Sequence, residues 1–184
     1  ARGDVVIFLD GDMTMAQGFL QAHADFHMRH SGAIAVGAIR WASEVPDTPF
    51  MRYAGSRGVG RFAAGQVPYK CFVTGNSSVP RQALIDVGCF DEIFSTYGGE
   101  DLELGYRLHL AGLKVFYEPT ACSLHHGWKG MQGMRESMAT YGAGSLPLLL
   151  ARHPELVDVL RLGFLRLPLW RPLRLAAAIA MWPA

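Results

Sequence analysis

The sequence predicts an α/β domain with a mostly parallel sheet, flanking helices and a helical C-terminal segment. Apolar runs typical of buried strands alternate along the chain with stretches of helical periodicity. Half of the 184 residues are apolar and 18% are charged, as in a globular protein. Acidic and histidine side chains follow several of the predicted strands directly, where parallel α/β sheets bind their ligands.

Composition excludes some classes of function. The formal net charge of +1, with basic residues spread out until the C-terminal segment, does not indicate nucleic-acid binding. The three cysteines lie far apart and form no CxxC pair, so they predict buried thiols in a reducing compartment.

The first elements alternate regularly. The apolar run at residues 5–9 predicts a buried strand that ends in the turn "DGDM". Residues 16–30 have helical spacing, and residues 33–41 predict a second strand. The segment 42–69 is rich in Gly, Pro, Ser and Arg and predicts a long loop with a short helix near 50–54.

The second half continues this order. We expect a strand over 70–74, a turn at Gly75–Asn76, a short strand ending at Val79 and a helix over 81–87. Residues 98–112 predict a second long helix that begins after two glycines. After this helix we expect two strands, at 113–119 and 121–126, and then helices over 131–184. We therefore divide the chain into an α/β domain, 1–130, and a helical segment, 131–184.

Asp10 and Asp12 are the first chemical motif. Residues two apart on an extended backbone point to the same side, and Gly11 lets the chain turn. Two such carboxylates suit Mg²⁺ or Mn²⁺, which prefer oxygen ligands and bridge to substrate phosphates. The alternative is an Asp-Gly turn with both acids solvated.

Glu100 and Asp101 open a predicted helix directly after Gly98 and Gly99. Acids at this position gain roughly 0.3–1 kcal/mol from the helix dipole, so an ordinary helix start explains them. In a functional reading, Asp101 is a general base that takes a proton from an attacking hydroxyl. The two glycines would let the backbone approach a bulky polar substrate.

His125 and His126 end the last predicted strand. Imidazole is a common metal ligand, and neighbouring residues on a strand face opposite ways, so one of the pair could complete the site of Asp10 and Asp12. A structural histidine is the alternative.

The chain resembles the family 2 glycosyltransferases, which have the Rossmann-like GT-A fold. The matching text is "VVIFLDGDM", "VTGNSSVPRQALIDVGCFDE", "GGEDLELGYRL" and "LKVFYEPTACSLHH", which together span about residues 4 to 126. The resemblance implies a partial GT-A domain with a nucleotide-sugar donor, a saccharide or lipid-linked acceptor, and Mn²⁺ or Mg²⁺ as cofactor.

The resemblance also implies roles for the motif residues. Asp10 and Asp12 would contact the donor diphosphate, directly or through the metal. His125 would be a further metal ligand, with His126 as second choice. The turn at Gly75 and Asn76 would lie near the donor sugar.

On the acceptor side, the resemblance makes Asp101 the base, while Glu100, Gly98 and Gly99 hold the acceptor or shape its loop. Attack of the acceptor hydroxyl on the anomeric carbon would invert its configuration in one displacement. Acids at strand ends are also found in metal-dependent nucleotidyltransferases, and a non-catalytic domain that binds a saccharide or a partner protein is a further alternative. The histidines lack the HExxH spacing of many metal hydrolases.

Both ends of the chain carry expectations. Because only nine residues precede Asp10, we expect this chain to be the C-terminal part of a longer enzyme, without its nucleotide-binding half. Near the other end, Arg161, Arg166, Arg171 and Arg174 interrupt Leu, Phe and Trp. That mixture favours an interfacial anchor at the inner face of the plasma membrane, in the cytoplasm, and an acceptor in cell-envelope polysaccharide or glycolipid synthesis. Packing helices, or a membrane-spanning helix cut off at Ala184, are the alternatives.

Overall fold

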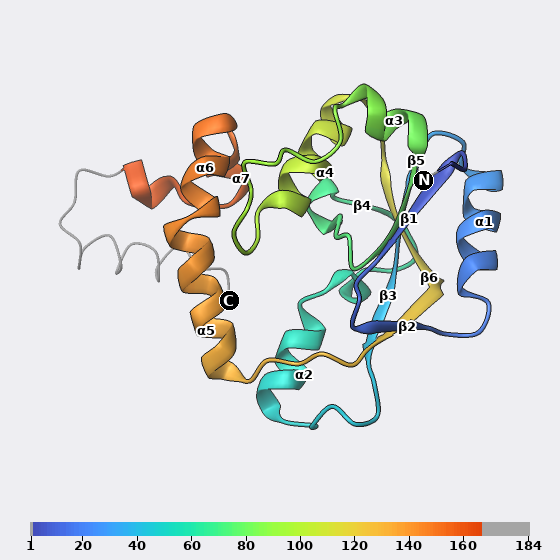
Figure 1. The fold of residues 1–184 in the computed structure, drawn as a ribbon, viewed down its shortest axis with the longest axis horizontal. Coiled ribbons are helices and arrows are strands. Elements are labelled where there is room, and N and C mark those ends of the chain that lie inside the picture. The colour runs from blue at the N-terminus through green and yellow to red at the C-terminus, as the bar shows by residue number, and fades with distance from the viewer. Residues whose placement is uncertain (1, 167–184) are drawn as a thin grey trace.

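A computed structural model describes residues 2–166 and shows a six-stranded sheet with helices on both faces (Figure 1). The strand order is β1-β5-β3-β6-β2, and β4 also pairs with β6. The strands are β1 (Val5–Leu9), β2 (Met13–Met15), β3 (Ile34–Trp41), β4 (Gly65–Val67), β5 (Asn76–Pro80) and β6 (Val115–His125).

The α/β class is confirmed, but the sheet is mixed, so the expectation of a mostly parallel sheet is wrong. Only β3 and β6 pair in parallel among the described strands; the other pairings are antiparallel. The reason is the insertion of β5 between β1 and β3 in the opposite direction. Strands β1, β3 and β6 still run the same way, so their carboxyl ends meet at one edge.

The helices of the α/β body cover both faces of this sheet. They are α1 (Phe19–Arg29), α2 (Pro49–Ser56), α3 (Arg81–Asp86) and α4 (Glu100–Leu110). Side chains of β3 alternate between the two faces, as a pleated strand requires. Ala35 packs with Phe26 of α1, whereas Ile34 and Val36 join the main core, to which α4 contributes Leu104.

The C-terminal helices pack beside α4. They are α5 (Met131–Ala143), α6 (Ser145–Arg152) and α7 (Leu156–Val159), and a 3-10 turn follows at Gly163–Arg166. Leu149 and Leu156 are fully buried in a separate small core with Tyr106 of α4. The division at residue 130 stays a prediction. Within residues 2–166 no helix is both long and apolar enough to cross a membrane, and most of the arginine-rich end lies outside this range.

Two predicted strands take another form. The strand expected over 70–74 is instead a 3-10 turn at Tyr69–Cys71, which Pro68 opens with a φ of −58°. The two strands expected over 113–119 and 121–126 are one strand, β6, whose pairing with β3 shifts in register between Gly37 and Ala38.

Candidate functional site

The edge where β1 and β6 end brings together the residues that the sequence analysis selected. Asp10 and Asp12 follow β1, and Met13 of β2 pairs with His125 at the end of β6. The antiparallel β5 begins at the same edge, because the amide of Asp10 donates a hydrogen bond to the carbonyl of Gly75, with 3.3 Å between N and O. A Cβ on Gly75 would stand 3.0 Å from Asp10 Oδ2, so the backbone at Gly75 lies close to the side chain of Asp10.

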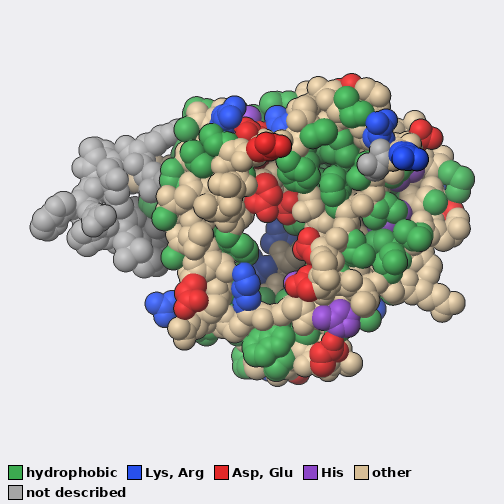
Figure 2. Space-filling model, in the orientation of Figure 1, with side chains coloured by type: hydrophobic (Ala, Val, Ile, Leu, Met, Phe, Trp, Pro, Cys, Tyr) green, Lys and Arg blue, Asp and Glu red, His purple; other side chains and the backbone are tan. Residues whose placement is uncertain are grey.

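A pocket of about 380 Å³ opens beside this edge, at the beginning of α4. Figure 2 shows the molecule hollowed in its centre, with acidic side chains on the walls of the hollow. The pocket is lined by Asp10, Thr74, Tyr97, Gly98, Gly99, Glu100, Asp101, Met138 and Tyr141. Its volume falls in the range of about 300–1,000 Å³ that is usual for small-molecule sites.

Asp101 lies in this pocket, as a general base requires. Burial raises the pKa of its carboxyl group, and the negative charges of Glu100 and Asp10 raise it further. A hydrogen bond from Thr74 Oγ1 to Asp101 Oδ1, 2.7 Å long, opposes this shift. Beside it, Glu100 Oε2 is buried without a hydrogen-bond partner among the described residues.

Asp12 is not among the residues that line this pocket, and its carboxylate contacts His125. His125 Nε2 lies 3.1 Å from Asp12 Oδ2, and the imidazole stacks on Trp41 with ring centroids 5.2 Å apart. His126 points elsewhere and contacts Thr14 and Glu44. A carboxylate and an imidazole suit Mn²⁺, and a phosphate-bridged ion needs few protein ligands. Nowhere in residues 2–166 do three His, Cys, Asp or Glu side chains form a ready cluster for a metal ion.

Asn76 has a structural position, and its side chain does not reach the pocket. It is fully buried, and its amide nitrogen donates to the backbone carbonyls of Ala38 and Ala121, at 3.0 and 2.9 Å. Its amide thereby bridges the register shift between β3 and β6. A Cβ on Gly37 would overlap both Asn76 and the carbonyl of Ala121, so this junction needs glycine. The side chain of Asn76 is thus used at the junction of β3 and β6, and its expected donor contact stays a prediction.

Gly98 and Gly99 line the pocket, but their conformation serves another contact as well. Both have positive φ, 80° and 97°, a region that favours glycine. A Cβ on Gly98 would stand 3.0 Å from the ring of Tyr141, and one on Gly99 would stand 3.2 Å from Ser145. These glycines thus let α5 and α6 dock against the loop before α4.

Sequence reasoning missed four lining residues: Thr74, Tyr97, Met138 and Tyr141. Thr74 carries no motif of its own. Met138 and Tyr141 lie three residues apart in a predicted helix, a spacing that indicates one face but not what that face covers.

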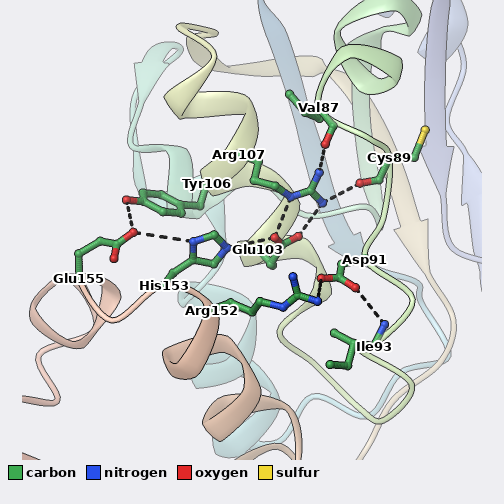
Figure 3. A network of polar contacts seen from close by, with 10 residues as sticks. All are labelled: Val87, Cys89, Asp91, Ile93, Glu103, Tyr106, Arg107, Arg152, His153 and Glu155. Carbon is green, nitrogen blue, oxygen red and sulfur yellow. Dashed lines mark hydrogen bonds and ion pairs between the residues drawn. The ribbon is translucent and has the colours of Figure 1, made fainter.

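A second polar network holds α4 against the C-terminal helices (Figure 3). Glu103, which is 2% exposed, receives two hydrogen bonds from Arg107, 2.7 and 2.6 Å long, and lies 3.1 Å from His153 Nε2. Arg107 also donates to the carbonyls of Val87 and Cys89. The helix that begins with Glu100 and Asp101 is thereby fixed at its middle by segments before and after it.

In each comparison with known proteins the chain is similar to glycosyltransferases. A family model described as the N-terminal domain of galactosyltransferase matches residues 60–126. The chain is 33% identical over 159 residues to the pre-mycofactocin glycosyltransferase of Mycobacterium tuberculosis, covering 83% of this chain and 33% of that protein. It is 37% identical over 98 residues to the validoxylamine A glucosyltransferase of Streptomyces hygroscopicus, covering 51% of this chain and 22% of that protein.

Among solved structures, the chain is similar in fold to a mannosyltransferase from Pyrobaculum calidifontis in complex with GDP-Man and Mn²⁺. The TM-score is 0.54 at 18% sequence identity, and the match covers 98% of this chain and 50% of that one. The chain spans a third or less of the length of these two curated relatives.

Proposed function

The chain carries a glycosyltransferase domain of the GT-A type, and we propose that it transfers a sugar, with inversion, from a nucleotide-sugar donor to an acceptor hydroxyl. The observation that carries this proposal is the position of Asp101 in the pocket at the beginning of α4. A carboxylate whose pKa is raised is a better proton acceptor than an exposed one. Asp101 takes the proton of the acceptor hydroxyl, whose oxygen attacks the anomeric carbon as the nucleoside diphosphate leaves.

The donor side of the proposal uses the sheet edge beside the pocket. Asp12 and His125 would hold Mn²⁺ or Mg²⁺, and such an ion stabilises the negative charge of a leaving diphosphate. Asp10 lines the same pocket as Asp101, and its amide contacts the carbonyl of Gly75; the donor sugar would stand beside them. The mannosyltransferase of similar fold holds a nucleotide sugar together with Mn²⁺, which supports this choice of ligands.

The acceptor side uses the far end of the pocket. Glu100 offers an unpaired carboxylate oxygen to an acceptor hydroxyl, and Gly98 and Gly99 form the loop that shapes this end. An acceptor in cell-envelope polysaccharide or glycolipid synthesis, met at the inner face of the plasma membrane, is part of the proposal. It rests on the arginines among apolar residues near the C-terminus of the sequence.

The test is calorimetric titration of the natural-length protein with nucleoside diphosphates, with and without Mn²⁺, followed by transfer assays with the nucleotide sugar that binds. We expect Asp12→Ala to abolish the Mn²⁺-dependent binding. Asp101→Asn should keep donor binding but lower the transfer rate at least about 10²-fold, since it removes the base. Asp47→Ala, an exposed acid paired with Arg52, is the matched control and should change neither.

Each alternative has its own outcome. Transfer of a nucleotidyl group, or binding of saccharide without any transfer in the wild type, would overturn the proposal. Full transfer activity in Asp101→Asn would remove Asp101 from the mechanism.

A further inference from the structure

The pocket has a second wall that the mechanism above does not use. Tyr97 comes from the loop before α4, and Met138 and Tyr141 come from one face of α5. Tyr97 is 43% exposed and Met138 is 46% exposed, although both belong to a recessed site. Three large side chains with apolar surface therefore face the acids Asp10, Glu100 and Asp101 across one small space.

This wall is held in place by the protein itself. The ring of Tyr141 packs against Gly98, which has no side chain to obstruct it. Lys129 Nζ lies 4.6 Å from the centre of the Tyr97 ring and also donates a hydrogen bond, 2.9 Å long, to Ser137 of α5. Contacts of this kind reduce the entropy that a ligand would lose in ordering the wall.

The same space offers one buried polar atom without a hydrogen-bond partner among the described residues, and a tyrosine hydroxyl. Glu100 Oε2 is buried and accepts no hydrogen bond from any of the described residues. Burial raises the pKa of Tyr141, and the charge of Glu100 raises it further, so its hydroxyl stays protonated and can donate. A ligand that completes this site needs hydroxyl groups along one edge and an apolar face that can lie on aromatic rings.

We propose that Tyr97, Met138 and Tyr141 form an acceptor subsite for a neutral pyranose ring, which places its C–H face on this wall and its hydroxyl edge on Glu100 and Asp101. The inference rests on the proposed function, since Asp101 is taken as the base. Aromatic faces recognise flat apolar surfaces, and unpaired carboxylate oxygens recognise hydroxyl donors. The three carboxylates repel a phosphorylated or carboxylated group, and an alkyl chain would leave Glu100 unpaired.

The experiment is saturation-transfer NMR on the natural-length protein without donor, using methyl glycosides of glucose, galactose, mannose and N-acetylglucosamine. Sorbitol and glucose 6-phosphate serve as the acyclic and anionic controls. We expect saturation to concentrate on the C–H face of at least one glycoside. Tyr141→Ala should weaken its binding roughly tenfold, whereas Tyr141→Phe, which keeps the ring, should weaken it by about threefold or less.

Tyr53→Ala is the matched control variant, because Tyr53 is 55% exposed on α2 and does not line the pocket. Circular dichroism checks that each variant is folded, and Tyr97→Ala tests the wall independently of the α5 contact. Equal binding of sorbitol or glucose 6-phosphate, or unchanged glycoside binding in both alanine variants, would overturn the inference. Donor binding and transfer that persist in that case would leave the proposed function intact, whereas glycoside binding without any transfer would overturn the proposed function and reduce the wall to a saccharide-binding surface.

Discussion

The basicity of the Asp101 carboxylate depends on its burial and on its hydrogen bond from Thr74. Burial and the charges of Glu100 and Asp10 raise the pKa of Asp101, and the hydrogen bond from Thr74 stabilises its charged form. The hydrogen bond from Thr74 thus favours the charged form of Asp101, while burial makes its carboxylate a stronger base than a solvated aspartate. Transfer activity should fall as the pH drops through this raised pKa.

Thr74→Val should move that acid limb to higher pH, because it removes the hydrogen bond that lowers the pKa of Asp101. A hydrogen bond to a charged group contributes about 1.5–3 kcal/mol, so the acid limb should shift by about one to two pH units. Thr74→Ser, which keeps the hydroxyl, should titrate as the wild type does. The measurement is kcat/KM against pH, and identical acid limbs in Thr74→Val and the wild type would contradict the prediction.

The sequence was more informative about the charged site residues than about Asn76. Asp10, Asp12 and His125 lie at the predicted sheet edge because a strand end fixes where the next side chain lies, and Asp101, in the first turn of α4, lines the pocket beside that edge. Asn76 differs, since an asparagine beside a turn has the same sequence pattern whether its amide binds a ligand or bridges two strands. Long-range packing decides between those roles.

Helix α4 owes its position to a buried charge network rather than to apolar packing alone. Glu103 is balanced by Arg107 and contacts His153 at the end of α6. On the same side, Tyr106 donates to Glu155, a bond of 2.7 Å that raises the pKa of Tyr106 to about 12. These contacts align α4, with Asp101 in its first turn, against the segment that carries the pocket wall.

Glu103→Gln should destabilise the protein by about 3 kcal/mol, because it removes the buried carboxylate that is the counter-charge of the partly buried guanidinium of Arg107. Arg52→Ala is the control, since its pair with Asp47 is exposed and such pairs contribute at most about 1 kcal/mol. Urea unfolding measures both. Equal losses in the two variants would mean that the network adds nothing beyond an ordinary surface pair.

The length and order of most elements could be predicted from apolar spacing, but strand direction could not. The apolar run of β1 has the same pattern whichever way its neighbour runs, so the insertion of β5 was not predictable from either segment. The 3-10 turn at Tyr69–Cys71 was missed because Lys70, Cys71 and Phe72 suit a strand. Pro68 can precede either a strand or a turn, and which of the two follows depends on the preceding segment.

At the scale of the whole molecule, a chain of hydrogen bonds joins histidines of α1 to polar side chains of β5, and the donor and acceptor of each bond can be assigned. The amide nitrogen of Asn76 donates to backbone, so its Oδ1 accepts from His23 Nε2, 3.1 Å away. Neutral His23 then accepts from Ser78 Oγ, which accepts from His27 Nε2, with both distances 2.8 Å. Burial lowers the pKa of His23, and burial with the nearby His23 lowers that of His27 to about 4.

Stability should therefore depend on pH in mild acid. In the unfolded chain these histidines bind protons below about pH 6.5, whereas in the folded protein His27 does so only near pH 4. Stability is then fully present above pH 6.5 and is lost as the pH falls toward 4. The loss attributable to His27 should be about 2 kcal/mol, a value reduced for its half-exposed position.

Guanidinium unfolding at pH 7.5, 6, 5 and 4.5 measures this dependence. His27→Gln should flatten it, because the amide keeps a donor toward Ser78 but does not titrate. The same loss of stability with pH in the variant and the wild type would show that the effect arises elsewhere.

The docking of α5 and α6 has a consequence for how the pocket opens. These helices meet the α/β body through the glycine contacts of the loop before α4, through the small core of Tyr106, Leu149 and Leu156, and through the polar network around Glu103. The main core contains no residue of α5. Detachment of the C-terminal helices is thus a sub-global opening, with a smaller free energy than complete unfolding. The acceptor subsite is lost in that opening while the sheet stays folded. A ligand that contacts both walls therefore binds only the state in which α5 and α6 are docked, and it raises the population of that state.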